Sequence, residues 1–137
     1  MRALALTALA LGCVGLDPLD APSLDRARFA ADVQPLLAAR CATPVCHGSE
    51  RRRLRVYAPG YFRRDPLRVH RDEPLDDAEL DANLASAAAF AADIPRAEDS
   101  LLVTKPLARV AHLGGRVFAS PEECEAIVAW MRAGGVP

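Results

Sequence analysis

Three residues that could bind a redox cofactor lie together near residue 45. The segment Cys41-Ala42-Thr43-Pro44-Val45-Cys46-His47 carries two cysteines, with a histidine directly after the second. Two such cysteines can form thioether bonds to one haem, and the adjacent histidine can then ligate its iron. The usual attachment motif has two residues between the cysteines, whereas this segment has four. The segment predicts Cys41 and Cys46 as covalent anchors of a c-type haem and His47 as the proximal iron ligand.

The same residues are compatible with two other chemistries. Cys41 and Cys46 could form a local disulfide, in which case the histidine beside them is incidental. Zinc is a third candidate, because cysteine thiolates and imidazoles are its usual ligands. His112 or Cys124 would then complete the ligand set.

The N-terminal end of the chain has the pattern of a signal peptide. Met1-Arg2 supplies a positive charge, and residues 3–11 are apolar apart from one threonine. Such a run is too short to cross about 30 Å of hydrocarbon as a helix. Leu9-Ala10-Leu11-Gly12-Cys13 resembles a bacterial lipobox, which predicts a signal peptide over residues 1–12 and lipidation of Cys13 as the first mature residue. An ordinary secretory signal is the alternative, and either predicts an exported protein, periplasmic or anchored in a membrane through an N-terminal lipid.

Export restricts the state of the other cysteines, because thiols do not stay reduced outside the cytoplasm. If Cys13 carries lipid, Cys41, Cys46 and Cys124 remain, and an odd number cannot all pair in disulfides. Cys124 falls in the last expected helix, where we expect a buried and inert thiol. A disulfide from Cys124 to Cys41 or Cys46 would exclude normal haem attachment.

Composition limits the class of protein. The chain has 137 residues, enough for one domain, and its net charge of -1 excludes a strongly basic nucleic-acid binder. With 51% hydrophobic and 26% charged residues, it is expected to be globular. The sequence has no Ser/His/Asp set with recognisable spacing and no glycine-rich phosphate loop, so it does not indicate an enzyme.

Hydrophobic periodicity predicts about four short helices joined by long irregular connections. A tether over residues 13–24 precedes the first helix, which ends near residue 40. We expect Ser23 to cap this helix and Pro35 to break or restart it. Its inner face carries four apolar residues, Phe29, Val33, Leu36 and Leu37.

Two further helices are expected in the middle of the chain. Asp76 or Asp77 begins the second helix, which stops before Pro95. A third covers residues 98–105, with Leu101 and Leu102 facing inward.

A clear helix start precedes the last helix. Ser120-Pro121-Glu122-Glu123 combines a cap, a proline at the first position and a glutamate three residues after the cap. Gly134-Gly135 ends this helix. Met131 belongs to its apolar face beside Trp130, so core packing is the expected role of Met131.

These landmarks resemble the cytochrome c-like domains of exported bacterial proteins, many of them lipoproteins. A segment similar to Asp32-Val33-Gln34-Pro35-Leu36-Leu37 precedes the Cys-His motif in that group. Segments similar to Ser100-Leu101-Leu102 and Lys105-Pro106-Leu107 precede the loop with the second iron ligand, and one similar to Ala129-Trp130-Met131-Arg132-Ala133-Gly134 closes the domain. The resemblance covers residues 29–135.

The resemblance implies a cytochrome c-like fold over residues 25–137 and one-electron transfer to a redox partner protein. The related domains place a methionine in the second-ligand loop, whereas here His112 stands at that place and Met131 is the less favoured candidate. An imidazole stabilises ferric iron better than a thioether does, so ligation by His112 would lower the potential. The competing interpretation is a non-redox lipoprotein, a binding or structural module on the same scaffold in which the haem is lost and Cys41 and Cys46 form a disulfide.

Two other charged features are prominent. The densest run of charge comprises Arg51, Arg52, Arg53 and Arg55. It is either a solvated face, a partner for haem propionates or a docking surface for an acidic redox partner. His70 lies among charged residues and is expected to be exposed.

Overall fold

The computed structural model describes residues 23–92 and 94–137. Within them the chain forms helices joined by long loops and contains no strand, which confirms the predicted all-α class. None of the helices in this part of the chain is long and apolar enough to cross a membrane.

The first helical region is continuous, but its character changes at a proline. α1 (Arg26–Arg28) leads into a π-helical segment (Phe29–Val33) and then into α2 (Gln34–Cys41). Pro35 lacks an N–H, and its ring crowds the carbonyl one turn earlier, so the helix widens at this point. The predicted restart at Pro35 is confirmed, although the chain does not break there. The N-cap is Asp25 and not Ser23, because the Asp25 carboxylate accepts a 2.6 Å bond from the N–H of Arg28.

The second predicted helix is confirmed as α3 (Asp77–Ala88), and its start is firmly specified. The Asp76 carboxylate accepts from the N–H of Glu79, and the Glu79 carboxylate accepts in return from the N–H of Asp76. This reciprocal capping box satisfies two backbone donors that a helix start leaves unpaired. The Glu79 side chain also forms a fully buried ion pair with Arg63 at 2.8 Å, which ties α3 to the long loop before it.

The third predicted helix is split. A 3-10 turn (Ala97–Asp99) is followed by α4 (Leu101–Thr104), with Ser100 between them in an extended conformation. The Ser100 hydroxyl accepts from the N–H of Leu102 and donates to the carbonyl of Phe90, so Ser100 caps α4. Leu102 is buried, whereas Leu101 is 40% exposed, which corrects the prediction that both face the core.

α5 (Glu125–Ala133) follows a 3-10 turn (Pro121–Cys124), ends at Gly134 as predicted, and packs against the first helical region. The rings of Phe29 and Trp130 lie 5.2 Å apart, and the Trp130 Nε1–H donates to the carbonyl of Asp25. Both rings are fully buried. Met131 is also fully buried in this core, which confirms its expected packing role.

A buried polar network fixes the loop that follows the Cys-His motif. Asn83 of α3 accepts from the N–H of Tyr57 and donates to the Tyr57 carbonyl and to Gln34 of α2. Because buried polar groups are costly when unpaired, this network holds the loop against both helices.

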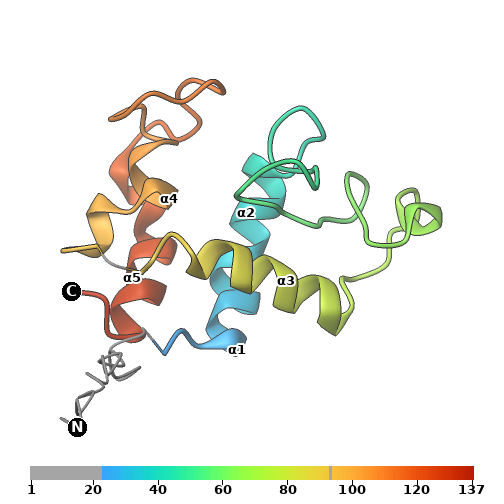
Figure 1. Ribbon diagram of the computed structural model, residues 1–137, viewed down its shortest axis with the longest axis horizontal. Helices are drawn as coiled ribbons and strands as arrows, with labels where there is room; N and C mark the ends of the chain where they lie inside the picture. The colour runs from blue at the N-terminus through green and yellow to red at the C-terminus, as the bar shows by residue number, and fades with distance from the viewer. Residues whose placement is uncertain (1–22, 93) are drawn as a thin grey trace, which may run out of the picture.

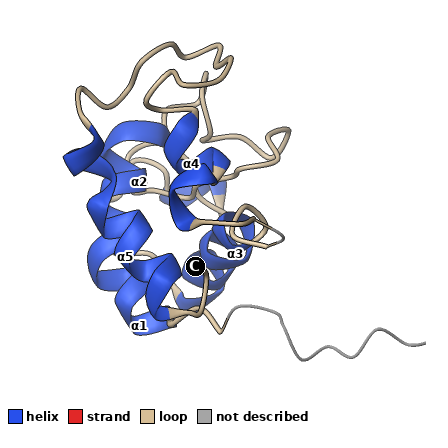
Figure 2. Ribbon diagram, turned by 90° about the vertical axis from the view of Figure 1, so that its left-hand side faces the viewer, coloured by secondary structure: helices blue, strands red, loops and turns tan. Residues whose placement is uncertain are grey.

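Two long loops lie at the same end of the molecule. The loop after α2 and the loop between α4 and α5 both lie at the top of Figure 1, and α1 lies at the opposite end (Figures 1 and 2). Residues far apart in the sequence are therefore brought to one site.

Candidate functional site

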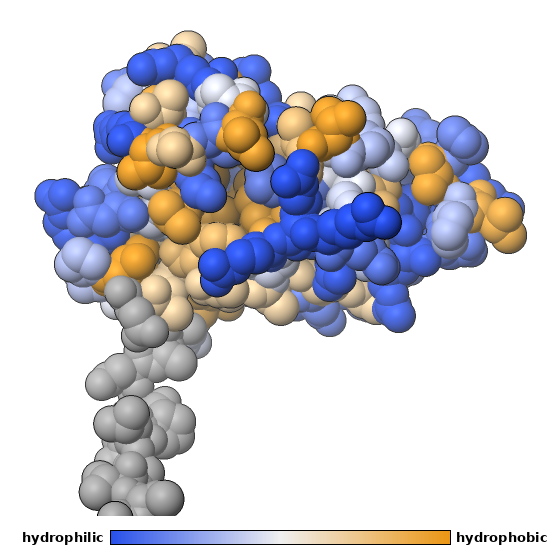
Figure 3. Space-filling view, turned by 45° about the horizontal axis from the view of Figure 1, so that its top comes forward, coloured by the Kyte–Doolittle hydropathy of each residue, from blue (hydrophilic) through white to orange (hydrophobic). Residues whose placement is uncertain are grey.

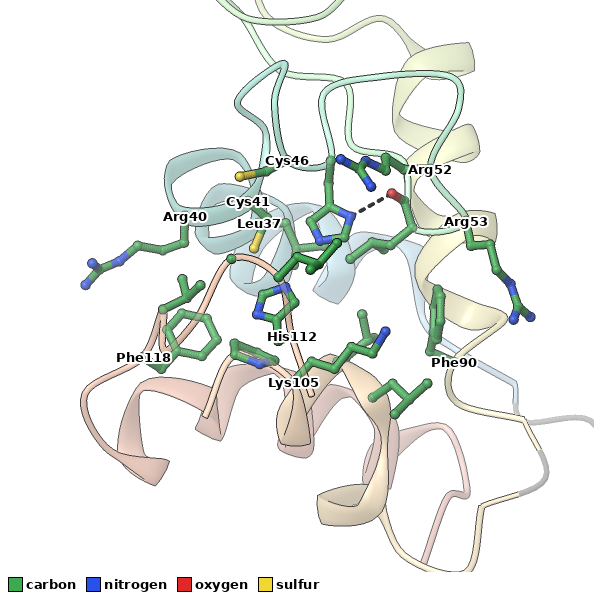
Figure 4. A pocket seen from close by; sticks show the side chains of 18 of the residues that line it. Leu37, Arg40, Cys41, Cys46, Arg52, Arg53, Phe90, Lys105, His112 and Phe118 are labelled. Atoms are coloured by element: carbon green, nitrogen blue, oxygen red, sulfur yellow. Dashed lines mark hydrogen bonds between the residues drawn. The ribbon is translucent and has the colours of Figure 1, made fainter. Parts of the chain in front are cut away.

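A cavity of about 590 Å³ lies between these two loops and the ends of α2 and α4 (Figure 4). Its size is typical of pockets that hold small molecules and cofactors. Figure 4 shows Cys41 and Cys46 on the α2 side and His112 on the facing loop. His47 and Leu101 also line the cavity, so Leu101 is exposed because it faces this space and not the core. The apolar wall includes Leu37, Leu54, Phe90, Leu102, Val117 and Phe118.

The four-residue spacer between the cysteines is folded into a tight turn. The N–H of Cys46 donates to the carbonyl of Thr43 at 2.9 Å, and the N–H of His47 donates to the carbonyl of Cys41 at 3.0 Å. The N–H of Gly48 also donates to Thr43, at 3.0 Å. The turn thus absorbs the extra length of the spacer and brings both cysteines and His47 to one cavity.

Gly48 is required where the turn closes. A Cβ atom at this position would lie 2.1 Å from the carbonyl oxygen of Ala42, a contact that no side chain can make. The turn therefore depends on a glycine directly after the histidine.

His47 is held with one nitrogen available. Its Nδ1 lies 2.9 Å from the carbonyl oxygen of Leu54, marked by the dashed line in Figure 4. A carbonyl only accepts, so Nδ1 carries the proton and donates, which leaves a lone pair on Nε2 of the neutral ring. Burial, together with the charges of His112, Arg52 and Lys105, lowers the pKa of His47 despite the opposing bond to Leu54. His47 is therefore presented as a neutral imidazole, the form that binds metal ions.

His112 is held in the same way by its own loop. Its Nδ1 lies 2.9 Å from the carbonyl oxygen of Gly115, and because a carbonyl only accepts, Nδ1 carries a proton and donates. Gly115 has a φ of +66°, a left-handed conformation in which glycine carries no Cβ penalty.

The loop with His112 begins at an unusual helix end. Ala108 has a φ of +55°, and the N–H groups of Ala108 and Arg109 donate to the carbonyls of Lys105 and Thr104. These paired bonds form a Schellman-type end, at which glycine is the usual left-handed residue. An alanine there costs roughly 1–2 kcal/mol of strain.

The two imidazoles face one another across the cavity. Their ring centroids lie 6.2 Å apart, and their planes differ by 17°. Each ring donates through Nδ1 to a backbone carbonyl, so each has Nε2 free for a ligand. The structure therefore brings together the two histidines that the sequence singled out, although they are 65 residues apart (112 minus 47).

Cys41, Cys46 and Cys124 are free cysteines, and no disulfide links these three in the described part of the chain. Burial, with smaller contributions from Cys46 and Cys124, raises the pKa of the Cys41 thiol to about 12. Burial also raises the pKa of Cys124 to about 11, with Arg109 opposing and Glu123 adding to the shift. Cys124 is buried as predicted and does not line the cavity, whereas Cys41 and Cys46 do.

All charged groups on the cavity wall are basic. Arg40, Arg52, Arg53 and Lys105 line it, and no aspartate or glutamate does so among the described residues. The sequence treats the arginine run as one unit, with three alternative roles. The structure divides it, because Arg52 and Arg53 line the cavity while Arg55 stacks on the ring of Tyr57 at 5.3 Å. His70 is exposed as predicted.

Other features of the site were not predicted. The carbonyls of Leu54 and Gly115 orient the two histidines, but backbone atoms leave no signature in the sequence. Arg40 and Lys105 could have been found only from their places at the ends of α2 and α4. Cys13 and the rest of the predicted signal peptide lie outside the described residues.

A closed zinc site is not supported within residues 23–92 and 94–137. No group of three or more His, Cys, Asp or Glu side chains there is placed to hold a metal ion, and structural zinc uses four protein ligands. Comparison of the chain with protein-family models, with curated proteins and with solved structures found no match.

Proposed function

We propose that this protein transfers single electrons through a covalently bound c-type haem. The observation that carries the proposal is the pair of imidazoles, His47 and His112, which face each other across a cavity lined by the thiols of Cys41 and Cys46. In this proposal the two cysteines would be the thioether anchors, and the two histidines would hold the iron.

The spacing of the two rings supports ligation of one iron from both sides. A bond from an imidazole nitrogen to a metal ion is about 2 Å long, and that nitrogen lies about 1 Å from the ring centre, so two rings that each pointed a nitrogen at one metal ion would have centres roughly 6 Å apart. The centroid distance of 6.2 Å between His47 and His112 agrees with this value. A haem also explains why two protein ligands suffice, because the porphyrin supplies the other four.

The walls of the cavity suit the rest of a haem. The apolar side chains fit the body of the macrocycle, and the basic charge of the described wall fits its two carboxylates. Arg52 is placed to serve both the cofactor and the turn, because its guanidinium donates to the carbonyl of Val45 at 3.0 Å.

When bound, the haem would supply a one-electron iron couple, and the chain would set its potential and access. Two imidazole ligands favour the ferric state more than an imidazole and a thioether do. Since Met131 is fully buried in the core and does not line the cavity, His112 is the ligand we propose opposite His47. The fold we propose is accordingly cytochrome c-like.

The test is an intact mass and a visible spectrum of protein produced in cells with c-type haem maturation. We expect a mass increase of one haem that survives denaturation, and a Soret band. Cys41→Ser and Cys46→Ser should each remove one thioether bond, whereas Cys124→Ser should leave both. A colourless protein whose mass is lower by two hydrogen atoms would overturn the proposal and support the non-redox module with a Cys41–Cys46 disulfide.

The second ligand has its own test. His112→Ala should convert a low-spin ferric spectrum to a high-spin one and change the potential, while the covalent mass increase remains. An unchanged spectrum and potential would remove His112 from the proposed ligand set. Export and lipidation at Cys13 remain predictions, because residues 1–22 lie outside the described part of the chain.

A further inference from the structure

The carbonyl that orients His47 belongs to a peptide group that a second side chain holds from the other end. His47 Nδ1 donates to the carbonyl oxygen of Leu54 at 2.9 Å. The N–H of the same peptide group belongs to Arg55 and donates to the hydroxyl of Ser86 at 2.7 Å. The hydroxyl of Ser86 donates in turn to the carbonyl of Arg53 at 3.2 Å. Ser86 therefore holds the residues on both sides of Leu54.

These three hydrogen bonds form one chain in which every donor points away from the imidazole. A trans peptide group such as this one is planar and carries its N–H and C=O on opposite sides, so fixing the N–H also fixes the direction of the C=O. Successive hydrogen bonds polarise one another, so each bond in the chain strengthens its neighbours. The bond at Ser86 should therefore both aim the Leu54 carbonyl at His47 and make it a better acceptor.

Ser86 projects from a helix that is itself tied to this part of the chain. Glu79, Asn83 and Ser86 are spaced four and three residues apart and so lie on one face of α3. Glu79 and Asn83 both bind the loop after the Cys-His motif, through the buried ion pair and through the backbone of Tyr57. Ser86 is the member of this row that reaches the Leu54 segment. The position of the carbonyl is thus set by α3 and not by the loop alone.

We propose that Ser86 is a positioning residue for His47, because it fixes the peptide group that keeps the imidazole in its Nδ1–H form with the lone pair on Nε2. A hydrogen bond at Nδ1 makes the opposite ring nitrogen a stronger ligand. A stronger imidazole ligand favours ferric iron, so Ser86 would lower the potential of a haem bound here. The effect on the potential rests on the proposed function, whereas the effect on the ring does not.

Removing the Ser86 hydroxyl should leave the protein folded. Ser86, Leu54 and Arg55 are half-buried, and Figure 3 shows many strongly hydrophilic side chains on the face that includes the end with the two loops. Water can therefore reach the backbone groups that Ser86→Ala leaves unpaired. Alanine also has the highest helix propensity, which offsets part of the loss within α3.

The first test reads the tautomer of His47 in the haem-free protein. Imidazole nitrogen NMR shifts measured at about pH 8, where neutral rings dominate, distinguish the Nδ1–H from the Nε2–H form. We expect Ser86→Ala to lower the ratio of the Nδ1–H to the Nε2–H form of His47 by roughly 2- to 10-fold, the change expected when one hydrogen bond is lost. Ser86→Thr, which keeps a hydroxyl, should restore the ratio. His112 is an internal reference, because its ring is bonded within its own loop, at Gly115.

Ser100→Ala is the matched control. The hydroxyl of Ser100 also joins two backbone groups, since it accepts from the N–H of Leu102 and donates to the carbonyl of Phe90, but neither group is bonded to His47 in the described structure. We expect this variant to lose stability and to keep the wild-type tautomer of His47. A wild-type ratio in Ser86→Ala, or equal changes in Ser86→Ala and Ser100→Ala, would overturn the proposal.

The second test is an equilibrium redox titration of the haem-loaded protein. Ser86→Ala should raise the potential, and Ser86→Thr should return it towards the wild-type value, which a purely structural role of Ser86 would not require. An unchanged potential in Ser86→Ala, despite a shifted tautomer, would overturn the proposed effect on the iron. A chain that shows the tautomer shift but binds no haem would overturn the proposed function and would still support the role of Ser86 in holding His47.

Discussion

The two loops that carry the histidines are built in different ways. The turn with His47 is tied by three bonds within the motif and by a bond from the N–H of Val56 to the carbonyl of His47. Its histidine is anchored seven residues away, at Leu54. His112 is anchored only three residues away, at Gly115, in a loop whose residues 108–116 are almost all exposed.

This difference between the two loops indicates that His47 is a fixed ligand and His112 an adjustable one. His47 is positioned by a closed turn that is also bonded to Val56, so its place is set by contacts beyond the turn itself. His112 is positioned by local bonds and by two left-handed residues, Ala108 and Gly115, so its place is set by the loop alone. We expect the loop with His112 to open more readily than the motif turn, because local opening is easiest where buried contacts are few.

Hydrogen exchange compares the two loops directly. We expect the largest difference between them in this measurement. In the haem-free protein, the N–H groups of Cys46, His47 and Gly48 are bonded within the turn. Those of residues 110–114 donate no hydrogen bond in the described structure. We expect exchange at residues 46–48 to be slower by at least about 100-fold, read by NMR or by mass spectrometry of fragments. Comparable rates in the two segments would remove the distinction between a fixed and an adjustable ligand.

Substituting the glycine of the motif turn should have the next largest effect. The new Cβ in Gly48→Ala would meet the carbonyl oxygen of Ala42 at 2.1 Å, and backbone must move to relieve the clash. We expect the free energy of unfolding in urea to fall by about 3 kcal/mol or more. Gly114→Ala in the other loop is the counterpart, since its Cβ would lie 3.2 Å from the His112 ring, a side chain that can shift. A loss for Gly114→Ala as large as that for Gly48→Ala would contradict the proposed difference in rigidity.

Three of the chemistry-bearing residues of the site could be predicted from the sequence because they are nearly contiguous. Cys41, Cys46 and His47 follow the end of α2 directly, so their convergence needs only a local turn. His112 could be proposed only through the resemblance, which implies a second iron ligand in the loop before the last helix; that loop lies between α4 and α5. The all-α class followed from helical periodicity and from caps such as Asp76 and Glu79.

The remaining features depend on tertiary contacts that no local pattern reveals. Ser100 interrupts the predicted third helix because its hydroxyl bonds across to Phe90. Leu101 has the expected type for a core position, but the cavity keeps it exposed. Ala108 adopts a left-handed conformation that sequence rules assign to glycine.

Replacing the anchor glycine of the loop with His112 should have a moderate effect. Gly115→Ala meets no atom within 4 Å, but its φ of +66° costs an alanine roughly 1–2 kcal/mol. Gly60→Ala is matched, with a φ of +76° and open space, and lies outside the cavity wall. We expect similar losses of stability in urea, but a changed spectrum of the haem-loaded protein only for Gly115→Ala. Identical spectra for both variants would show that the Gly115 carbonyl does not orient the ligand.

The smallest predicted effect is a pH dependence of stability. His47 should make the haem-free protein less stable in acid. Burial lowers the pKa of His47 from its ordinary value of 6.5, so the unfolded chain takes up a proton at a pH where the folded protein does not. The free energy of unfolding should therefore fall as the pH drops below about 6.5, and it should continue to fall down to the lower pKa of the folded state. This residue contributes a slope of at most about 1.4 kcal/mol per pH unit. Above that range the residue contributes no slope. Urea titrations between pH 7.5 and pH 5 should show a flatter dependence for His47→Gln than for the wild type. Equal slopes for His47→Gln and the wild type would mean that the ring is protonated as readily in the folded turn as in water, and that the turn does not hold His47 as a neutral ligand.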